Sequence, residues 1–412
     1  MIDMKRIYPL MLAALMLCSC GQAADNTAES TTSGSISSDV LSKETETAAE
    51  TAQTEDSLRT FSAADEKYVR LLGRTAENDG VLWLGQTDSG CEFSFTGTMA
   101  SMTVLGDDTA NTNGEGSYAR FAVYLNGERV LDELVKEKEK TYDIFSSDEE
   151  KENTVSIIKL SEASNSAFGI KDITVDSDKD PVPTEEKALK IEFIGDSITC
   201  GYGVDDEVKE HHFSTATEDG TKTYAYKAAK ALDADYSMVC NSGHGIISGY
   251  TTQGKKVAAQ QMPKFYTKTA RSYTRAGEFS INDVMWDFDR FVPDIIVINL
   301  GTNDSSYTGA NSEYQNEFRD AYVEFLKKLR KYNPDAYILC TLGIMGNDLY
   351  PSIEEAVGMY TDETGDERVS AFLFGTQDGS TGFAADWHPT EATHQIAADK
   401  LVQEIERLGL KK

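Results

Sequence analysis

Apolar and polar residues alternate along much of residues 59–180, as they do in half-buried β-strands. The clearest runs are residues 91–95 and 121–125, in which the first, third and fifth side chains are apolar. Asn126-Gly127 follows the second run directly, and this pair favours a tight hairpin turn. The pattern therefore predicts an antiparallel β-sandwich of jelly-roll type over residues 59–180.

After Pro181-Val182-Pro183 the pattern changes to short, continuous apolar runs separated by segments of helical length. Such runs are typical of parallel strands that are buried on both faces. Five of them are present, at residues 190–194, 237–239, 295–300, 337–342 and 369–374. We expect an α/β domain over residues 184–412, in which helices cover both faces of a five-stranded parallel sheet in three layers.

The first twenty residues have a pattern of their own. Two basic residues, Lys5 and Arg6, precede an apolar segment at 10–17, and the sequence Leu-Cys-Ser-Cys then ends at Cys20. This order resembles a bacterial lipoprotein signal, which implies removal of residues 1–19 and lipid attachment at Cys20. An ordinary cleaved signal peptide and a membrane span are the alternatives, and the shortness of the apolar segment disfavours a span.

Residues 20–58 are rich in Ser, Thr, Ala and Glu and lack aromatic residues. Such a composition cannot bury enough apolar surface to fold, so we expect a flexible tether. A tether that begins at a lipidated Cys20 predicts an extracytoplasmic protein that is anchored at the membrane surface.

Charge bears on the class of partner, and the cysteines bear on disulfides and metal sites. The chain of 412 residues has 69 acidic and 39 basic residues, a net charge of −30, which argues against a nucleic-acid partner because phosphates require Lys and Arg. Four of the six cysteines lie beyond the signal, and three of these are in or beside predicted strands, so no disulfide is required. No cysteine and histidine group has zinc-site spacing, and we expect neither a metal nor another cofactor.

Polar residues gather where predicted parallel strands end, which is where open α/β sheets bind ligands. A serine at such a strand-to-helix junction, here Ser197, has its N–H at the positive end of a helix, where it can stabilise an oxyanion. Its hydroxyl needs a base, and among five histidines only His388 has both a strand-exit position and a carboxylate, Asp386, two residues upstream. The strand exits read Gly195-Asp196-Ser197, Asn241-Ser242-Gly243, Gly301-Thr302-Asn303-Asp304 and Asp386-Trp387-His388-Pro389.

These four blocks, in this order, resemble the SGNH/GDSL hydrolases. The resemblance implies a serine esterase with Ser197 as nucleophile and His388 as base. It also implies an oxyanion hole formed by the N–H of Ser197, the N–H of Gly243 and the side-chain amide of Asn303.

The orientation of His388 leaves two alternatives. SGNH hydrolases carry Asp-x-x-His, whereas position 385 is Ala, so Asp386 is the acid of the expected Ser-His-Asp triad. A residue this close to the histidine reaches Nδ1 only from a tightly curved loop. If Asp386 points away, a backbone carbonyl orients the ring, and the site is a Ser-His dyad.

The block from Gly195 to Gly203, together with the β-sandwich ahead of it, is similar to carbohydrate esterase family 2, the acetyl xylan esterases. This similarity implies removal of acetyl groups from hemicellulose-type polysaccharides through an acyl-enzyme. The alternatives are another SGNH acyl hydrolase, either a peptidoglycan O-acetyl esterase or a lipase-like enzyme, and a non-catalytic glycan-binding protein. Three aromatic residues near strand exits are candidates for stacking on a sugar, namely Trp387, Tyr202 and Trp286. His394, inside the last predicted helix, is expected on the surface.

Overall fold

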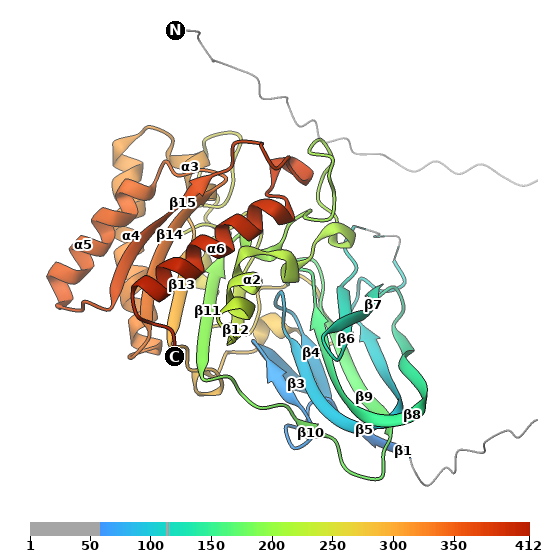
Figure 1. Cartoon of the computed structure of the whole chain (residues 1–412). Coiled ribbons are helices and arrows are strands. Elements are labelled where there is room, and N and C mark those ends of the chain that lie inside the picture. Colours follow the sequence, from blue (N-terminus) through green and yellow to red (C-terminus); the bar gives the residue numbers. More distant parts are fainter. Residues whose placement is uncertain (1–57, 113, 115) are drawn as a thin grey trace, which may run out of the picture. The chain divides into compact units, whose positions relative to one another are not determined.

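The computed structural model describes residues 58–112, 114 and 116–412 (Figure 1). The predicted signal, the lipidation site at Cys20 and residues 20–57 of the predicted tether lie outside these ranges. Among the described residues, no helix is both long and apolar enough to cross a membrane.

Antiparallel strands form the first of two sheets (Figure 1). Their order is β3-β4-β9-β5-β8-β6-β7, with β1 paired to β9, and with β2 and β10 paired to β5. The strands are β1 Leu58–Phe61, β2 Arg70–Leu72, β3 Thr75–Asn78, β4 Val81–Leu84, β5 Gly90–Gly106, β6 Arg120–Leu125, β7 Glu128–Leu134, β8 Glu139–Lys159, β9 Phe168–Asp176 and β10 Val182–Pro183.

The two longest strands, β5 and β8, link two halves of this sheet. β5 pairs with β2 and β10 before Gly97 and with β9 from Ala100 onward, while β8 runs beside it throughout. Register shifts lie at this change of neighbour, as expected where β-bulges bend a strand. A Cβ at Gly97 would come 2.1 Å from the Asp176 carbonyl oxygen, so only glycine fits there. Side chains from both halves share one buried core, which confirms the predicted N-terminal antiparallel β domain.

Five parallel strands form the second sheet, in the order β12-β11-β13-β14-β15. Neighbouring side chains of β13 face opposite ways: Ile295 and Val297 join one core, and Ile296 and Ile298 join the other. This two-sided burial explains the continuous apolar runs in the sequence. The strands are β11 Leu189–Gly195, β12 Ala234–Cys240, β13 Ile295–Asn299, β14 Tyr337–Ile344 and β15 Val369–Thr376.

Helices cover both faces of the parallel sheet, which confirms the predicted three layers (Figure 1). Helices α2 (Tyr224–Ala231) and α6 (Glu391–Arg407) pack on one face, and α4 (Ser312–Tyr332) and α5 (Tyr350–Thr364) pack on the other. Two short helices, α1 Ser197–Cys200 and α3 Thr302–Thr308, follow β11 and β13. The 3-10 helices are Thr215–Thr217, Gly220–Lys222, Met262–Lys264, Ile281–Asp283, Phe288–Arg290 and Ala385–Trp387.

Buried charge joins the two sheets. Arg74, between β2 and β3, has its Nη2 3.0 Å from Oε2 of Glu192 on β11, and both side chains are buried. The hydroxyl of Tyr266 donates a second hydrogen bond to Glu192, at 2.7 Å. Their mutual attraction and these hydrogen bonds offset part of the free-energy cost of removing two charges from water.

Candidate active site

Ser197 is the first residue of α1, which follows β11 after a single residue, Asp196. The Asp196 side chain caps this helix, because its Oδ1 accepts the N–H of Ile198 at 3.0 Å. At the other end Gly201, with φ 83, ends the helix in a left-handed conformation. The short helix therefore holds the serine at the carboxyl edge of the parallel sheet.

His388 lies against Ser197 although 191 residues separate them in sequence, with Nε2 2.9 Å from the serine Oγ. Its Nδ1 lies 3.0 Å from the carbonyl oxygen of Ala385. A carbonyl can only accept a hydrogen bond, so the proton stays on Nδ1 and the lone pair of Nε2 faces the serine hydroxyl. The structure thus brings the predicted nucleophile and base together as a dyad oriented by a backbone carbonyl.

The predicted contact between Asp386 and the His388 ring is wrong. Oδ2 of Asp386 accepts the hydroxyl of Tyr202 at 2.5 Å, and Oδ1 lies 2.9 Å from Nδ1 of His212. Asp386 and Trp387 both adopt left-handed backbone conformations, with φ of 48 and 58. Left-handed conformations are costly for non-glycine residues, and here they curl the loop so that a carbonyl, not the carboxylate, meets the imidazole.

The three aromatic candidates for sugar stacking have different surroundings. Tyr202 stacks on His388, with ring centroids 3.9 Å apart and an interplanar angle of 15°, so this face of its ring covers the base instead of a sugar. Trp286 is only 6% exposed, beside the Arg74 guanidinium, and the prediction that it contacts substrate is wrong because long-range packing buries it. Trp387 is 42% exposed next to His388, and its contact with substrate stays a prediction.

The expected oxyanion donors come from three strand exits. Gly243 follows β12 with φ 73, a conformation that favours glycine. Within the part of the chain that the structure describes, no protein acceptor contacts the N–H of Ser197 or of Gly243. Nδ2 of Asn303 lies 3.1 Å from Oδ2 of Asp196 and 2.8 Å from the carbonyl oxygen of His244. Its two hydrogens thus have protein acceptors, and a ligand oxygen must share one of them.

Burial shifts the pKa values of the ionisable groups at the site. It lowers the pKa of His388 to about 4, because an imidazolium in this enclosed position would lose its hydration. It also raises the pKa of Asp196 to about 7 and that of Asp304 to about 6. A neutral imidazole therefore faces the serine across the neutral and mildly acidic range.

Asp304 braces the loop beyond Gly243. Its carboxylate accepts the backbone N–H groups of Ile246, Ile247 and Ser248 at 2.7 to 3.0 Å. His394, by contrast, is not on the surface as expected, because its Nδ1 accepts the N–H of Tyr224 at 3.2 Å inside the protein.

One buried group has three side chains with metal-ligating atoms. Atoms of Glu162, Cys200 and Glu218 all lie within 4.8 Å of one another. Burial raises the pKa of the Cys200 thiol well above its ordinary value, which disfavours the thiolate that metals bind. That the protein needs no metal stays a prediction.

A hydroxyl and an imidazole at the carboxyl edge of a five-stranded parallel sheet define a serine esterase of the SGNH/GDSL class. Residues 193–396 match the GDSL-like lipase/acylhydrolase family, and residues 71–184 match the carbohydrate esterase 2 N-terminal domain. A family two carbohydrate esterase from Clostridium thermocellum, solved with cellohexaose, is 31% identical; the match covers 83% of this chain and 99% of that one, with a TM-score of 0.71. The chain belongs to carbohydrate esterase family 2.

Three further relatives match over most of this chain. Est2A, an acetyl xylan esterase from Butyrivibrio proteoclasticus, is 25% identical over 86% of this chain and 99% of that chain, with a TM-score of 0.75. An acetylxylan esterase / glucomannan deacetylase of Cellvibrio japonicus is 26% identical over 84% of this chain and 90% of its own length. Cellulase/esterase CelE of Acetivibrio thermocellus is 32% identical over 81% of this chain, which spans only 40% of CelE.

Proposed function

We propose that this protein removes acetyl groups from hemicellulose-type polysaccharides through an acyl-enzyme on Ser197. The observation that carries the proposal is the 2.9 Å contact between the serine hydroxyl and Nε2 of His388, a base whose other nitrogen is held by a carbonyl. The relatives named as acetylxylan esterases support acetyl as the acyl group and a plant polysaccharide as its carrier.

The reaction begins as His388 takes the hydroxyl proton while Oγ of Ser197 attacks the acetyl carbonyl carbon. Negative charge develops on the carbonyl oxygen, within reach of the N–H groups of Ser197 and Gly243 and the amide of Asn303. His388 then gives its proton to the ester oxygen of the sugar as the bond from this oxygen to the acetyl carbon breaks, so the sugar departs as an alcohol and acetyl-serine remains. The same imidazole next takes a proton from water, which attacks the acetyl carbon; the bond to Oγ breaks, acetate leaves, and His388 returns the proton to Ser197.

The Ala385 carbonyl performs the orienting task that a carboxylate performs in a triad. It accepts both the backbone N–H of His388 at 3.0 Å and the ring Nδ1–H. A neutral acceptor stabilises the imidazolium less than a carboxylate would, and this fits the low pKa of His388. Tyr202 adds a stacked ring that holds the imidazole plane.

The polysaccharide would bind along the carboxyl edge of the parallel sheet. Trp387 is the exposed aromatic side chain adjacent to the base, where its ring can stack on a sugar face. The net charge of −30 suits a neutral polymer better than an anionic one.

We also propose the arrangement of the whole chain: a signal at residues 1–19, a tether at 20–58, the β domain at 59–180 and the esterase domain at 184–412. Lipid attachment at Cys20 would hold the protein outside the cytoplasm at the membrane surface, and the Leu-Cys-Ser-Cys sequence supports it. Replacement of Cys20 by Ser should move the protein from the membrane fraction to the soluble fraction, whereas a protein that stays in the membrane fraction contradicts the anchor.

A substrate panel tests the proposed activity. Acetate release is measured from acetylated xylan, acetylated glucomannan and O-acetylated peptidoglycan, and nitrophenol release is measured from a long-chain nitrophenyl ester. We expect the two plant polysaccharides to react fastest and a Ser197→Ala variant to bind them without turnover. A preference for peptidoglycan or for long acyl chains would favour the other SGNH hydrolases, and equal inertness of wild type and variant would favour a glycan-binding protein.

A further inference from the structure

The N-terminal β domain holds the loop that carries Gly243. Glu162, between β8 and β9, accepts the backbone N–H of Ser242 on its Oε2 at 2.7 Å. Nearby, the side-chain amide of Asn241 lies 2.7 Å from Oγ of Ser164. Two consecutive residues before Gly243 are therefore bound by one short segment of the other domain.

Gly243 lies between two anchored points. On one side the Ser242 N–H is held by Glu162, and on the other the Gly243 carbonyl accepts the N–H of Tyr250 at 2.9 Å. The direction of the Gly243 N–H depends on the peptide plane between these points. An oxyanion donor that is displaced by a fraction of an ångström loses much of its effect on the transition state.

Glu162 is itself held from several directions. It is 2% exposed, its own N–H donates to Oε2 of Glu218 at 2.9 Å, and its Oε1 accepts from the amide of Asn165 at 3.2 Å. The ammonium of Lys159 lies 2.9 Å from its carbonyl oxygen. The backbone of Glu162 is thus fixed at its N–H and its carbonyl, and each carboxylate oxygen has one partner, Asn165 or Ser242, so the buried side chain is held as a positioning group requires.

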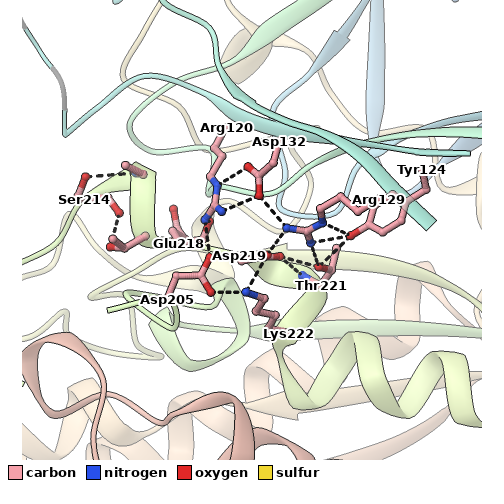
Figure 2. A network of polar contacts seen from close by, with 12 residues as sticks. Arg120, Tyr124, Arg129, Asp132, Asp205, Ser214, Glu218, Asp219, Thr221 and Lys222 are labelled. Carbon is pink, nitrogen blue, oxygen red and sulfur yellow. Dashed lines mark hydrogen bonds and ion pairs between the residues drawn. The ribbon is translucent and has the colours of Figure 1, made fainter. Parts of the chain in front are cut away.

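Figure 2 shows the polar network that begins at Glu218. The carbonyl oxygen of Glu218 lies 3.3 Å from Nη1 of Arg120 on β6. The Arg120 guanidinium also forms ion pairs with Asp132 and Asp205, each at 2.8 Å. Arg129 on β7 pairs with Asp219, the next residue along, at 2.8 Å. The network joins the segment around 205–222 to β6 and β7 and so fixes Glu218. Glu218 in turn fixes the Glu162 backbone, because its carboxylate accepts the Glu162 N–H.

We propose that Glu162 is a positioning residue of the oxyanion hole, by which the N-terminal β domain sets the direction of the Gly243 N–H. The inference rests on the proposed esterase activity and assigns the β domain a part in it. Glu162 touches neither substrate nor Ser197, and its effect reaches the reaction through Ser242. Its loss should therefore lower kcat more than it changes KM, because the oxyanion forms only in the transition state.

The chain offers a matched control at the opposite end of β12. Arg70 on β2 pairs with Glu92 at 2.8 Å and with Asp235, the second residue of β12. This contact also joins the two domains through a charged group, but at the amino end of the strand, whereas Gly243 follows its carboxyl end. Arg70→Ala therefore weakens the interface without touching the oxyanion loop.

The test compares kcat, KM, pH profile and melting temperature for wild type, E162A, E162Q, S164A and R70A on nitrophenyl acetate and acetylated glucomannan. We expect E162A to lower kcat on the order of 10- to 100-fold with KM little changed and the pH midpoint unmoved. E162Q keeps an oxygen acceptor for the Ser242 N–H and should restore most of this loss. R70A should lower the melting temperature and keep kcat.

Several outcomes would overturn the inference. One is an E162A kcat equal to that of wild type, and another is a loss in E162A that R70A matches at the same loss of stability. If E162A does not fold, E162D decides, because it keeps the charge but draws the carboxylate away from the Ser242 N–H; its kcat should fall several-fold at constant KM, and an unchanged kcat contradicts the proposal. S164A removes only the contact to Asn241 and should lower kcat less than E162D. Hydrolysis by wild type separates these outcomes from failure of the esterase assignment itself.

Discussion

The hydroxyl of Tyr202 donates to Oδ2 of Asp386 at 2.5 Å, and this bond ties the carboxylate to the ring that covers the catalytic imidazole. Asp386 therefore makes no hydrogen bond to Nδ1 of His388, although its charge opposes the burial that lowers the pKa of the imidazole. Tyr202 comes from the turn after α1 and Asp386 from the loop before α6, so the bond also joins the segments of nucleophile and base.

Removal of the Asp386 carboxylate should cost little. In a Ser-His-Asp triad, loss of the aspartate lowers kcat by about 10⁴. Here the Ala385 carbonyl stays in place, so we expect Asp386→Ala to lower kcat by no more than about tenfold, a loss typical of an imperfectly held base. Steady-state kinetics on nitrophenyl acetate measures this. A loss of three orders of magnitude would restore the triad assignment, and Tyr202→Phe, which keeps the ring, is the control for the hydroxyl.

The acid limb of the activity profile should lie well below the ordinary histidine range. Only the neutral imidazole accepts the serine proton, and burial lowers the pKa of His388 to about 4. As the pH falls, the base therefore stays neutral until this value is approached, and kcat should decline with a midpoint near it. A kcat profile at saturating substrate measures the midpoint. A midpoint near 6.5, the ordinary histidine value, would mean that His388 is not desolvated as the structure shows.

Asn303 should affect both turnover and stability. Loss of one oxyanion donor costs on the order of 10² to 10³ in kcat, or about 3 kcal/mol. The same amide also donates to Asp196 and to the His244 carbonyl, and both acceptors would lose their donor in Asn303→Ala. We expect a kcat loss in this range together with a lower melting temperature. A stable variant with unchanged kcat would show that the N–H groups of Ser197 and Gly243 suffice.

The buried pair between the two sheets should dominate the stability of their contact. Arg74→Ala leaves the Glu192 carboxylate without its charged partner, and breaking a buried ion pair in this way costs about 3 to 5 kcal/mol. The double variant Arg74→Met with Glu192→Gln removes both charges and should recover part of that loss. Urea unfolding measures the three proteins. A single variant within about 1 kcal/mol of wild type would show that water solvates this pair.

Much of the architecture could be predicted, because parallel strands that are buried on both faces have continuous apolar runs in the sequence. The place of the site could be predicted because the carboxyl ends of these strands lie along one edge of the sheet. The strand-exit positions of Ser197 and His388 followed from those runs and from the motifs beside them, and their roles followed from the resemblance to the SGNH/GDSL hydrolases. The orientation of Asp386 could not be predicted, because it depends on left-handed conformations at 386 and 387 that non-glycine residues rarely adopt.

Contacts between distant segments also left no local signal. Trp286 is buried beside Arg74, and His394 is buried where it accepts the N–H of Tyr224, and both partners are distant in the sequence. The bond from Glu162 to the Ser242 N–H joins residues 80 positions apart. Glu162 binds a loop of the esterase domain from within the β domain, and this contact can be recognised only in the folded structure, where the two domains meet.

Trapping the acyl-enzyme tests directly whether Ser197 is the nucleophile. Wild-type protein is mixed with an excess of nitrophenyl acetate, quenched in acid within the first turnovers and digested for peptide mass spectrometry. We expect an acetyl group on the peptide that holds Ser197, slower formation of this species in His388→Ala, and none in Ser197→Ala. Acetate release that persists in Ser197→Ala, or acetylation of another residue at the rate of turnover, would contradict this role of Ser197.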